Sequence, residues 1–206
     1  MKLPIDSPRV AKWFVIPILI HLIIACSKVE VDSYPSLYFV VIDSLIGEQQ
    51  TFSEQNIILH PPVGLLKISG EDFSALQATV QSDTSLYLPT EPLFAGGTPY
   101  GLYMVVSQVS TGPDNLAVFN DRYAEYLDNK FPDCEINRTQ YSLNDFPTIQ
   151  YIITSRTSVL IKLYCMNGNR CTQVDYFLNR EQYTDIAHIL ESSIGSINRN
   201  NKEETR

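Results

Sequence analysis

The stretch "NDFPTIQYIITSRTSVLIKLYCMNGNRCTQVDYFL", residues 144–178, decides the fold of this chain. Three runs of β-branched, aromatic and aliphatic residues lie in it, at 148–154, 158–165 and 172–178. Such runs are typical of strands. Connections this short join antiparallel neighbours in one sheet. Asn167-Gly168 is the clearest hairpin signal in the chain.

Further strands and three helices are predicted on either side of this meander. Apolar residues recur with helical spacing over 70–81, 115–130 and 180–197. Short strand patterns occur at 37–43, 56–60, 64–68, 85–88, 101–110 and 135–141. This order predicts an α+β fold in which helices cover a mostly antiparallel sheet.

Capping signals support the three helices. Ser69 and Asp72 form a cap signature at the start of the first. Asp114 is the expected N-cap of the second, and Asn179 with Gln182 the expected cap of the third.

The N-terminal residues predict export. Lys2, Arg9 and Lys12 form a basic region, and a thirteen-residue apolar run follows at 13–25. A helix that crosses a bilayer needs about twenty apolar residues. The run is too short for that and fits the apolar region of a signal peptide over residues 1–25.

The end of that run, Ile23-Ile24-Ala25-Cys26, resembles the lipobox of bacterial lipoproteins. The resemblance implies that the Cys26 thiol carries a lipid and that Cys26 becomes the mature N-terminus. An uncleaved signal anchor and an ordinary signal-peptidase site are the alternatives. By the same analogy, Ser27 favours the outer membrane of the cell envelope and leaves open the periplasmic or the surface face.

The net charge limits the kinds of partner, and the chain length limits the number of domains. The 206-residue chain has a formal charge of −8. Without residues 1–25 it keeps 12 basic and 22 acidic residues, about −10. This argues against nucleic acid and against anionic lipid, so the lipid anchor would supply membrane binding. We expect a tether over 26–36, a single globular domain over 37–197 and a disordered tail over 198–206.

The sequence shows no catalytic, metal or cofactor motif. His60 and His188 are the only histidines after the leader, and no zinc-ligand spacing surrounds them. We expect both to be structural or surface residues. Gly96 and Gly97 lack the sequence context of a phosphate-binding loop and are interpreted as turn glycines.

A family resemblance follows from the order of elements. The runs "HPPVGLLKI" (60–68), "FNDRYAEYLDNKFP" (119–132) and "YTDIAHILESSIGSI" (183–197), together with the meander, look like a PsbP-like α/β/α sandwich over roughly residues 52–197. PsbP-like proteins are mostly non-enzymatic accessory proteins, so the resemblance carries no active site.

The sequence therefore leaves two possible functions open. The first is a non-catalytic envelope lipoprotein that binds another protein and needs no cofactor. The alternative is a small-ligand binder or an enzyme that uses the segment from Leu93 to Tyr100 as a pocket. A flat face of exposed aromatic residues would favour the first, and a deep polar cleft the second.

Export would place the remaining three cysteines in an oxidising compartment. Cys134 lies at the far end of the meander, so we expect it to stay unpaired. Cys165 and Cys171 are a candidate disulfide. A two-residue Asn-Gly turn would put their thiols on opposite faces of the sheet, whereas a three-residue loop would pair them directly. The sequence leaves both arrangements open.

Overall fold

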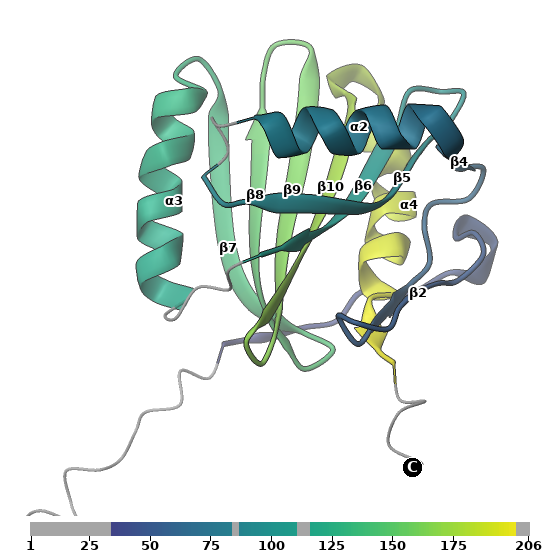
Figure 1. Cartoon of the computed structure of the whole chain (residues 1–206), viewed down its shortest axis with the longest axis horizontal. Helices are drawn as coiled ribbons and strands as arrows, with labels where there is room; N and C mark the ends of the chain where they lie inside the picture. Colours follow the sequence, from purple (N-terminus) through teal and green to yellow (C-terminus); the bar gives the residue numbers. More distant parts are fainter. Residues whose placement is uncertain (1–33, 84–86, 111–115, 201–206) are drawn as a thin grey trace, which may run out of the picture. The chain divides into compact units, whose positions relative to one another are not determined.

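The computed structural model describes residues 34–83, 87–110 and 116–200 (Figure 1). The predicted signal peptide, Cys26 and the expected helix cap Asp114 lie outside the described residues. From Tyr34 onward the chain forms one compact unit.

The predicted meander forms the middle of an eight-stranded sheet. The strands lie in the order β1-β7-β8-β9-β10-β6-β5-β4, and every neighbouring pair is antiparallel except β1 with β7. Their bounds are β1 Ser36–Leu37, β4 Leu66–Lys67, β5 Thr90–Gly97, β6 Tyr103–Val109, β7 Glu135–Leu143, β8 Phe146–Thr154, β9 Ser158–Asn167 and β10 Arg170–Asn179. The prediction of a mostly antiparallel sheet is confirmed.

Two-residue turns set the register of the meander. Asn144 and Asp145 join β7 to β8 with φ values of +47° and +68°, a left-handed conformation in which Asn and Asp are enriched. Gly168 and Asn169 join β9 to β10, and Gly168 has φ +63°. The prediction of an Asn167-Gly168 turn is wrong by one residue. Glycine takes the first turn position, where a positive φ is needed.

Helices lie on both sides of the sheet (Figure 1). α4 (Tyr183–Gly195) follows the short 3-10 helix η2 (Arg180–Gln182), and the Asn179 side chain accepts a hydrogen bond from the Glu181 backbone N–H there. α4 packs Ile186, Leu190 and Ile194 into one core. α3 (Leu116–Lys130) packs Phe119, Tyr123 and Leu127 into a second core on the other face.

Successive residues of β9 and β10 alternate between these cores. Seven of their residues belong to the core under α4, namely Val159, Ile161, Leu163, Cys165, Val174, Tyr176 and Leu178. Tyr164, between Leu163 and Cys165, joins the core under α3. We call the two sides the α4 face and the α3 face.

The third helix, α2 (Gly70–Ser82), lies beside β5 and is drawn in front of the sheet in Figure 1. Its predicted apolar side, Phe73, Leu76 and Val80, is only half-buried. Ser69 is the N-cap but makes no side-chain capping bond, so the predicted cap pairing with Asp72 is absent. α2 therefore covers the sheet more loosely than α3 and α4 do.

A small second sheet corrects the predicted tail. β11 (Asn198–Arg199) pairs with β3 (Ile57–Leu59), which also pairs with β2 (Gln50–Phe52). The prediction of disorder from residue 198 is wrong for 198–200. Backbone pairing and the Arg199 guanidinium, 5.1 Å from the ring centroid of Phe146, hold this end of the chain. Residues 201–206 lie outside the described residues.

Two predicted strands differ in the structure. The predicted strand over 37–43 shrinks to β1, after which the chain leaves the sheet and enters the short 3-10 helix η1 (Asp43–Leu45). Ser36, which the sequence assigned to the tether, already belongs to β1. The predicted strand over 85–88 falls partly outside the described residues, and β5 begins only at Thr90.

Candidate functional site

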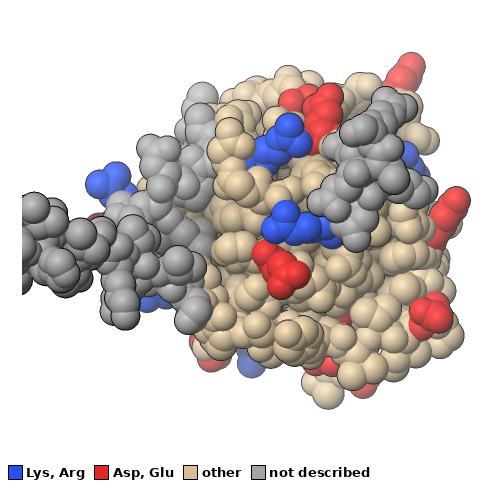
Figure 2. Space-filling model, turned by 90° about the horizontal axis from the view of Figure 1, so that it is seen from below, with Lys and Arg blue, Asp and Glu red and all other residues tan. Residues whose placement is uncertain are grey.

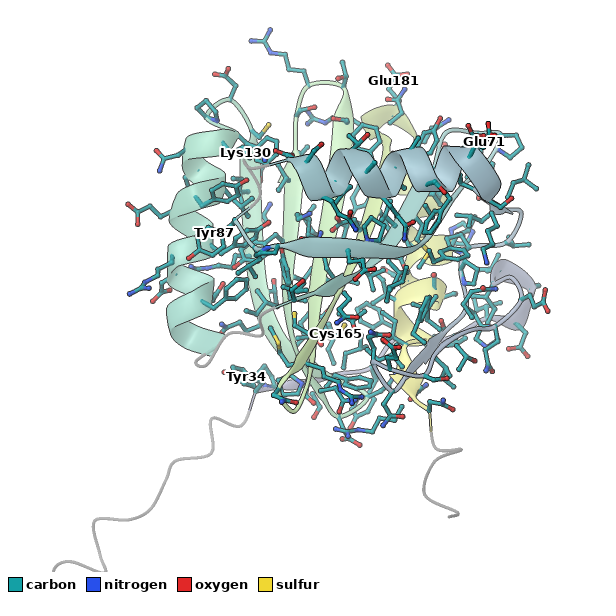
Figure 3. The ribbon with its side chains drawn as sticks, in the orientation of Figure 1. Tyr34, Glu71, Tyr87, Lys130, Cys165 and Glu181 are labelled. Carbon is teal, nitrogen blue, oxygen red and sulfur yellow. The ribbon has the colours of Figure 1, made fainter. Side chains whose placement is uncertain are left out.

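Six aromatic rings gather between α3 and the sheet. Tyr123 lies at their centre, 5.1–5.5 Å from five other ring centroids, those of Tyr87, Phe119, Tyr126, Tyr151 and Tyr164. Figure 3 shows Tyr87 against α3 and Lys130 at the end of that helix. The rings meet mostly at tilted or edge-to-face angles, the arrangement that aromatic side chains prefer in cores.

A partly buried ion pair borders this cluster on the sheet. Lys162 and Asp175 are cross-strand partners on β9 and β10, and Lys162 Nζ lies 2.9 Å from Asp175 Oδ2. Gln173 Nε2 donates a hydrogen bond of 2.6 Å to the same oxygen. The two charged side chains are 12% and 20% exposed. Replacing either residue of a pair so shielded from solvent should destabilise the fold, because the remaining charge would lose its partner while still partly buried.

The cavity beside the ion pair is small. It has a volume of about 60 Å³ and is lined by Leu88, Lys162, Gln173 and the surrounding rings. Pockets for small ligands usually measure about 300–1,000 Å³, and one water takes about 30 Å³. This cavity can hold a water or two and is too small for a substrate-sized ligand.

The buried phenols and thiols are neutral groups at physiological pH. Burial raises the pKa of the Cys165 thiol to about 12 and raises the pKa of Cys171 as well. Burial also raises the pKa of five phenols, those of Tyr123, Tyr141, Tyr151, Tyr164 and Tyr176. A nucleophile or general base that works near neutral pH needs the opposite adjustment. These side chains serve packing and hydrogen bonding.

An exposed apolar row crosses four strands on the α3 face. Leu66, Gly97, Tyr103 and Phe177 are successive register partners on β4, β5, β6 and β10. The three side chains in this row are 68%, 49% and 47% exposed. Gly97 belongs to the row because a Cβ there would lie only 2.9 Å from the Tyr103 ring. We call these four residues the apolar row.

A shallow hollow of about 440 Å³ lies beside the apolar row. Its lining includes Leu66 and Tyr103, the start of α2 at Ser69 and Asp72, and the turn residue Pro99. A concave surface edged by aromatic and aliphatic side chains is typical of protein-binding surfaces.

Charged side chains do not gather on the face shown in Figure 2, where acidic and basic residues are interspersed and most of the surface is neither. That face therefore offers no basic stripe of the kind that binds nucleic acid.

The two histidines lie apart from these features. His60 Nδ1 is 2.9 Å from the Gly47 carbonyl oxygen, and the His60 backbone N–H donates to Ser196 Oγ at 2.8 Å. His188 is exposed on α4. Among the residues that the structure describes, no three His, Cys, Asp or Glu side chains lie close enough to hold a metal ion.

The candidate disulfide between Cys165 and Cys171 is not formed. These two cysteines and Cys134 are free. Cys165 pairs with Thr172 and Cys171 with Met166, so the two thiols lie on opposite faces of the sheet. Cys165 packs in the core under α4 and Cys171 in the core under α3.

The segment from Leu93 to Tyr100 is not a loop. Residues 93–97 belong to β5, and Gly96 is a strand residue whose added Cβ would approach Leu65 Cδ2 to 2.1 Å. The interpretation of Gly96 and Gly97 as turn glycines is therefore wrong. Only the end of this segment, from Gly97 to Pro99, borders the hollow.

Sequence reasoning missed the ion pair and the apolar row. Lys162 and Asp175 interrupt two apolar strand patterns, and the turn placed one residue later would have paired them. The apolar row had no local signal, because its members come from strands separated by α2 and α3 in the sequence.

Of the comparisons with known proteins, only the one with solved structures gave matches. No protein-family model and no curated protein sequence matches the chain. The solution structure of cyanobacterial PsbP (CyanoP) from Synechocystis sp. PCC 6803 matches with a TM-score of 0.51 and 10% identity, over 80% of this chain and 97% of that one. The Ran-binding protein Mog1p of Saccharomyces cerevisiae matches with a TM-score of 0.46 and 8% identity, over 76% and 96%. The chain therefore has a PsbP-like fold.

Proposed function

We propose that this chain is a non-catalytic, lipid-anchored protein of the bacterial cell envelope that binds another protein through the apolar row. The observation that carries the proposal is the alignment of Leu66, Tyr103 and Phe177 across adjacent strands, each at least 47% exposed. Exposed apolar surfaces of this kind are typical of interaction sites, and protein-binding sites are among them.

Covering the apolar row with a partner protein would contribute to the free energy of binding. Full burial of a Leu or Phe side chain is worth about 1.5–3 kcal/mol. Because Tyr103 and Phe177 are about half exposed, a partner that covered them would gain about 1 kcal/mol from each. The hollow beside Tyr103 would accept a protruding apolar side chain of that partner.

The alternative, a small-ligand site in the segment from Leu93 to Tyr100, has less support. The hollow there is shallow, and only Gly97, Thr98 and Pro99 of that segment line it. The cavity beside the ion pair is too small for a ligand.

The anchoring part of the proposal rests on the sequence Ile23-Ile24-Ala25-Cys26. No helix in the described part of the chain is long and apolar enough to cross a membrane. Two or more acyl chains on Cys26 would hold the protein stably, since each buried CH₂ contributes about 0.8 kcal/mol. The same analogy with sorting signals favours the outer membrane.

Photo-crosslinking in living cells tests the binding surface. A benzophenone amino acid at position 103 should give one discrete adduct with a protein, and the same group at Glu181, an exposed polar position on η2, should not. Adding Leu66→Asp should reduce the adduct severalfold without lowering the amount of folded chain. Adducts of equal yield at both positions, or an adduct indifferent to Leu66→Asp, would show that the row is not a binding surface.

Labelled palmitate tests the anchor separately. The natural chain should incorporate label and fractionate with membranes, and Cys26→Ser should lose both. Continued labelling of Cys26→Ser would refute lipidation at that residue.

A further inference from the structure

A second exposed apolar surface lies close to the predicted anchor. The segment "LYFVVI", residues 37–42, leaves five of its six side chains at least 39% exposed. Their exposed fractions are 40% for Leu37, 79% for Tyr38, 79% for Val40, 39% for Val41 and 44% for Ile42. We call this segment the N-terminal ledge. Apolar residues exposed singly are ordinary, but five within a run of six residues need an explanation.

The ledge is held in place from below. Val41 turns a methyl group toward Gly195 of α4, 3.1 Å from where a Cβ on that glycine would lie. Phe39, which also points inward, meets the Tyr141 ring edge-on at 6.3 Å. Its Cβ lies so close to Gly195 of α4 that any side chain there would come within 2.7 Å. Ser192 Oγ accepts a hydrogen bond from the Ile42 backbone N–H at 3.4 Å. The outward display is therefore part of the folded domain.

We propose that the N-terminal ledge rests on the surface of the lipid bilayer, in contact with zwitterionic phospholipid. The inference relies on the lipid anchor at Cys26 proposed above. Leu37 follows Cys26 by eleven residues. A chain spans at most about 3.3–3.6 Å per residue, so the ledge can be no farther than about 40 Å from the anchored cysteine. Such a short tether holds the ledge at a high effective concentration near the membrane.

The side chains of the ledge suit a bilayer surface. Tyr38 combines an apolar ring with a polar hydroxyl, a pairing enriched at membrane interfaces. Val40, Val41 and Ile42 supply apolar area, with no Lys or Arg between residues 34 and 43. Attraction to anionic headgroups is absent, and the chain is itself acidic. The contact is therefore apolar and should be insensitive to salt.

Tryptophan fluorescence measures this contact directly. The chain has a single tryptophan, Trp13, in the predicted leader. The full chain would carry Trp13→Phe, and either Val40→Trp on the ledge or Phe177→Trp in the apolar row as the matched reporter. Each protein, after processing in a bacterial envelope, would be reconstituted in phosphatidylcholine vesicles with brominated acyl chains.

We expect a blue shift and about a twofold loss of fluorescence for Val40→Trp, because interfacial side chains enter the region where headgroups meet acyl chains. Phe177→Trp should show neither, and the Val40→Trp signal should not change with salt. An unquenched Val40→Trp, or equal quenching at both positions, would overturn the proposal. A blue shift that depends on protein concentration without vesicles would instead show that a second copy covers the ledge.

Mass spectrometry of Cys26 on the same samples separates the two proposals. A lipidated Cys26 with unquenched Val40→Trp refutes the ledge contact and leaves the anchor standing. An unlipidated Cys26 with quenched Val40→Trp refutes the anchor and supports the contact. If Cys26 carries no lipid and Val40→Trp is unquenched, both proposals fail.

Discussion

Raising the pH from 8 to 11 should unfold this domain, because seven buried acidic groups resist ionisation in the folded state. They are Cys165, Cys171, Tyr123, Tyr141, Tyr151, Tyr164 and Tyr176, and burial raises the pKa of each. The unfolded chain releases these protons at ordinary pKa values, whereas the folded chain keeps them. Their contribution to stability is therefore fully present below the unfolded pKa values and is lost as the pH rises above them.

The size of the loss follows from the ordinary pKa values, 9.0 for cysteine and 10.0 for tyrosine. Each group lowers the free energy of unfolding by about 1.36 kcal/mol per pH unit above that value, as long as it stays protonated in the folded state. At pH 11 the two thiols and five phenols together remove about 12 kcal/mol. Domains are usually stable by about 5–15 kcal/mol, so unfolding is expected between about pH 10 and 11.5.

Urea denaturation followed by circular dichroism at pH 8, 9, 10 and 11 measures this slope. Tyrosinate absorbance gives a second readout, because five of the twelve tyrosines should ionise only as the chain unfolds. Tyr141→Phe should reduce the number of protons released on unfolding by one. Ionisation of all twelve phenols before any loss of folded signal would refute the reasoning. So would a stability loss between pH 10 and 11 below about 1.4 kcal/mol per pH unit, the value for one proton.

Three further predictions concern packing and reactivity. Gly195→Ala should destabilise the domain by about 1–3 kcal/mol in urea, because the new Cβ would lie 2.7 Å from the segment that crosses it, whereas Gly47→Ala has its nearest contact at 3.4 Å and should cost little; equal costs would contradict this. Tyr151→Phe should cost about 1–3 kcal/mol, because its hydroxyl donates a 2.6 Å hydrogen bond to a buried side-chain oxygen on α3, and an unchanged urea midpoint would argue against that bond. In the native protein a maleimide should modify the half-exposed Cys134 and spare Cys165, as peptide mass spectrometry can show; modification of both at the unfolded rate would mean that the core is open.

Local sequence patterns were sufficient for the three helices, the meander and the fold class. The strands at 148–154, 158–165 and 172–178 and the three helices lie where periodicity placed them. These elements depend on neighbours a few residues apart, and short connections leave antiparallel pairing as the only arrangement. The lipid anchor at Cys26 is also a sequence inference, and it stays a prediction.

The strand register and the exposure of individual side chains could be learned only from the tertiary structure. The turn at Gly168 and Asn169 lies one residue beyond the predicted position, and that single step gives Cys165 the partner Thr172 in place of Arg170. Side chains alternate with a period of two, so a pattern that predicts a strand does not say which partner each residue meets.

The two proposed surfaces show the same limit of prediction from sequence patterns. The sequence patterns at Tyr103 and Phe177 are those of ordinary strand residues, yet the two side chains are 49% and 47% exposed. The sequence pattern around Val40 also predicts a strand, yet the chain leaves β1 before Val40 and crosses α4. The sequence by itself determined the three helices and the strands of the meander, since those depend on local periodicity. Only the tertiary structure decided which apolar side chains remain in water, because burial depends on what packs against them from distant parts of the chain.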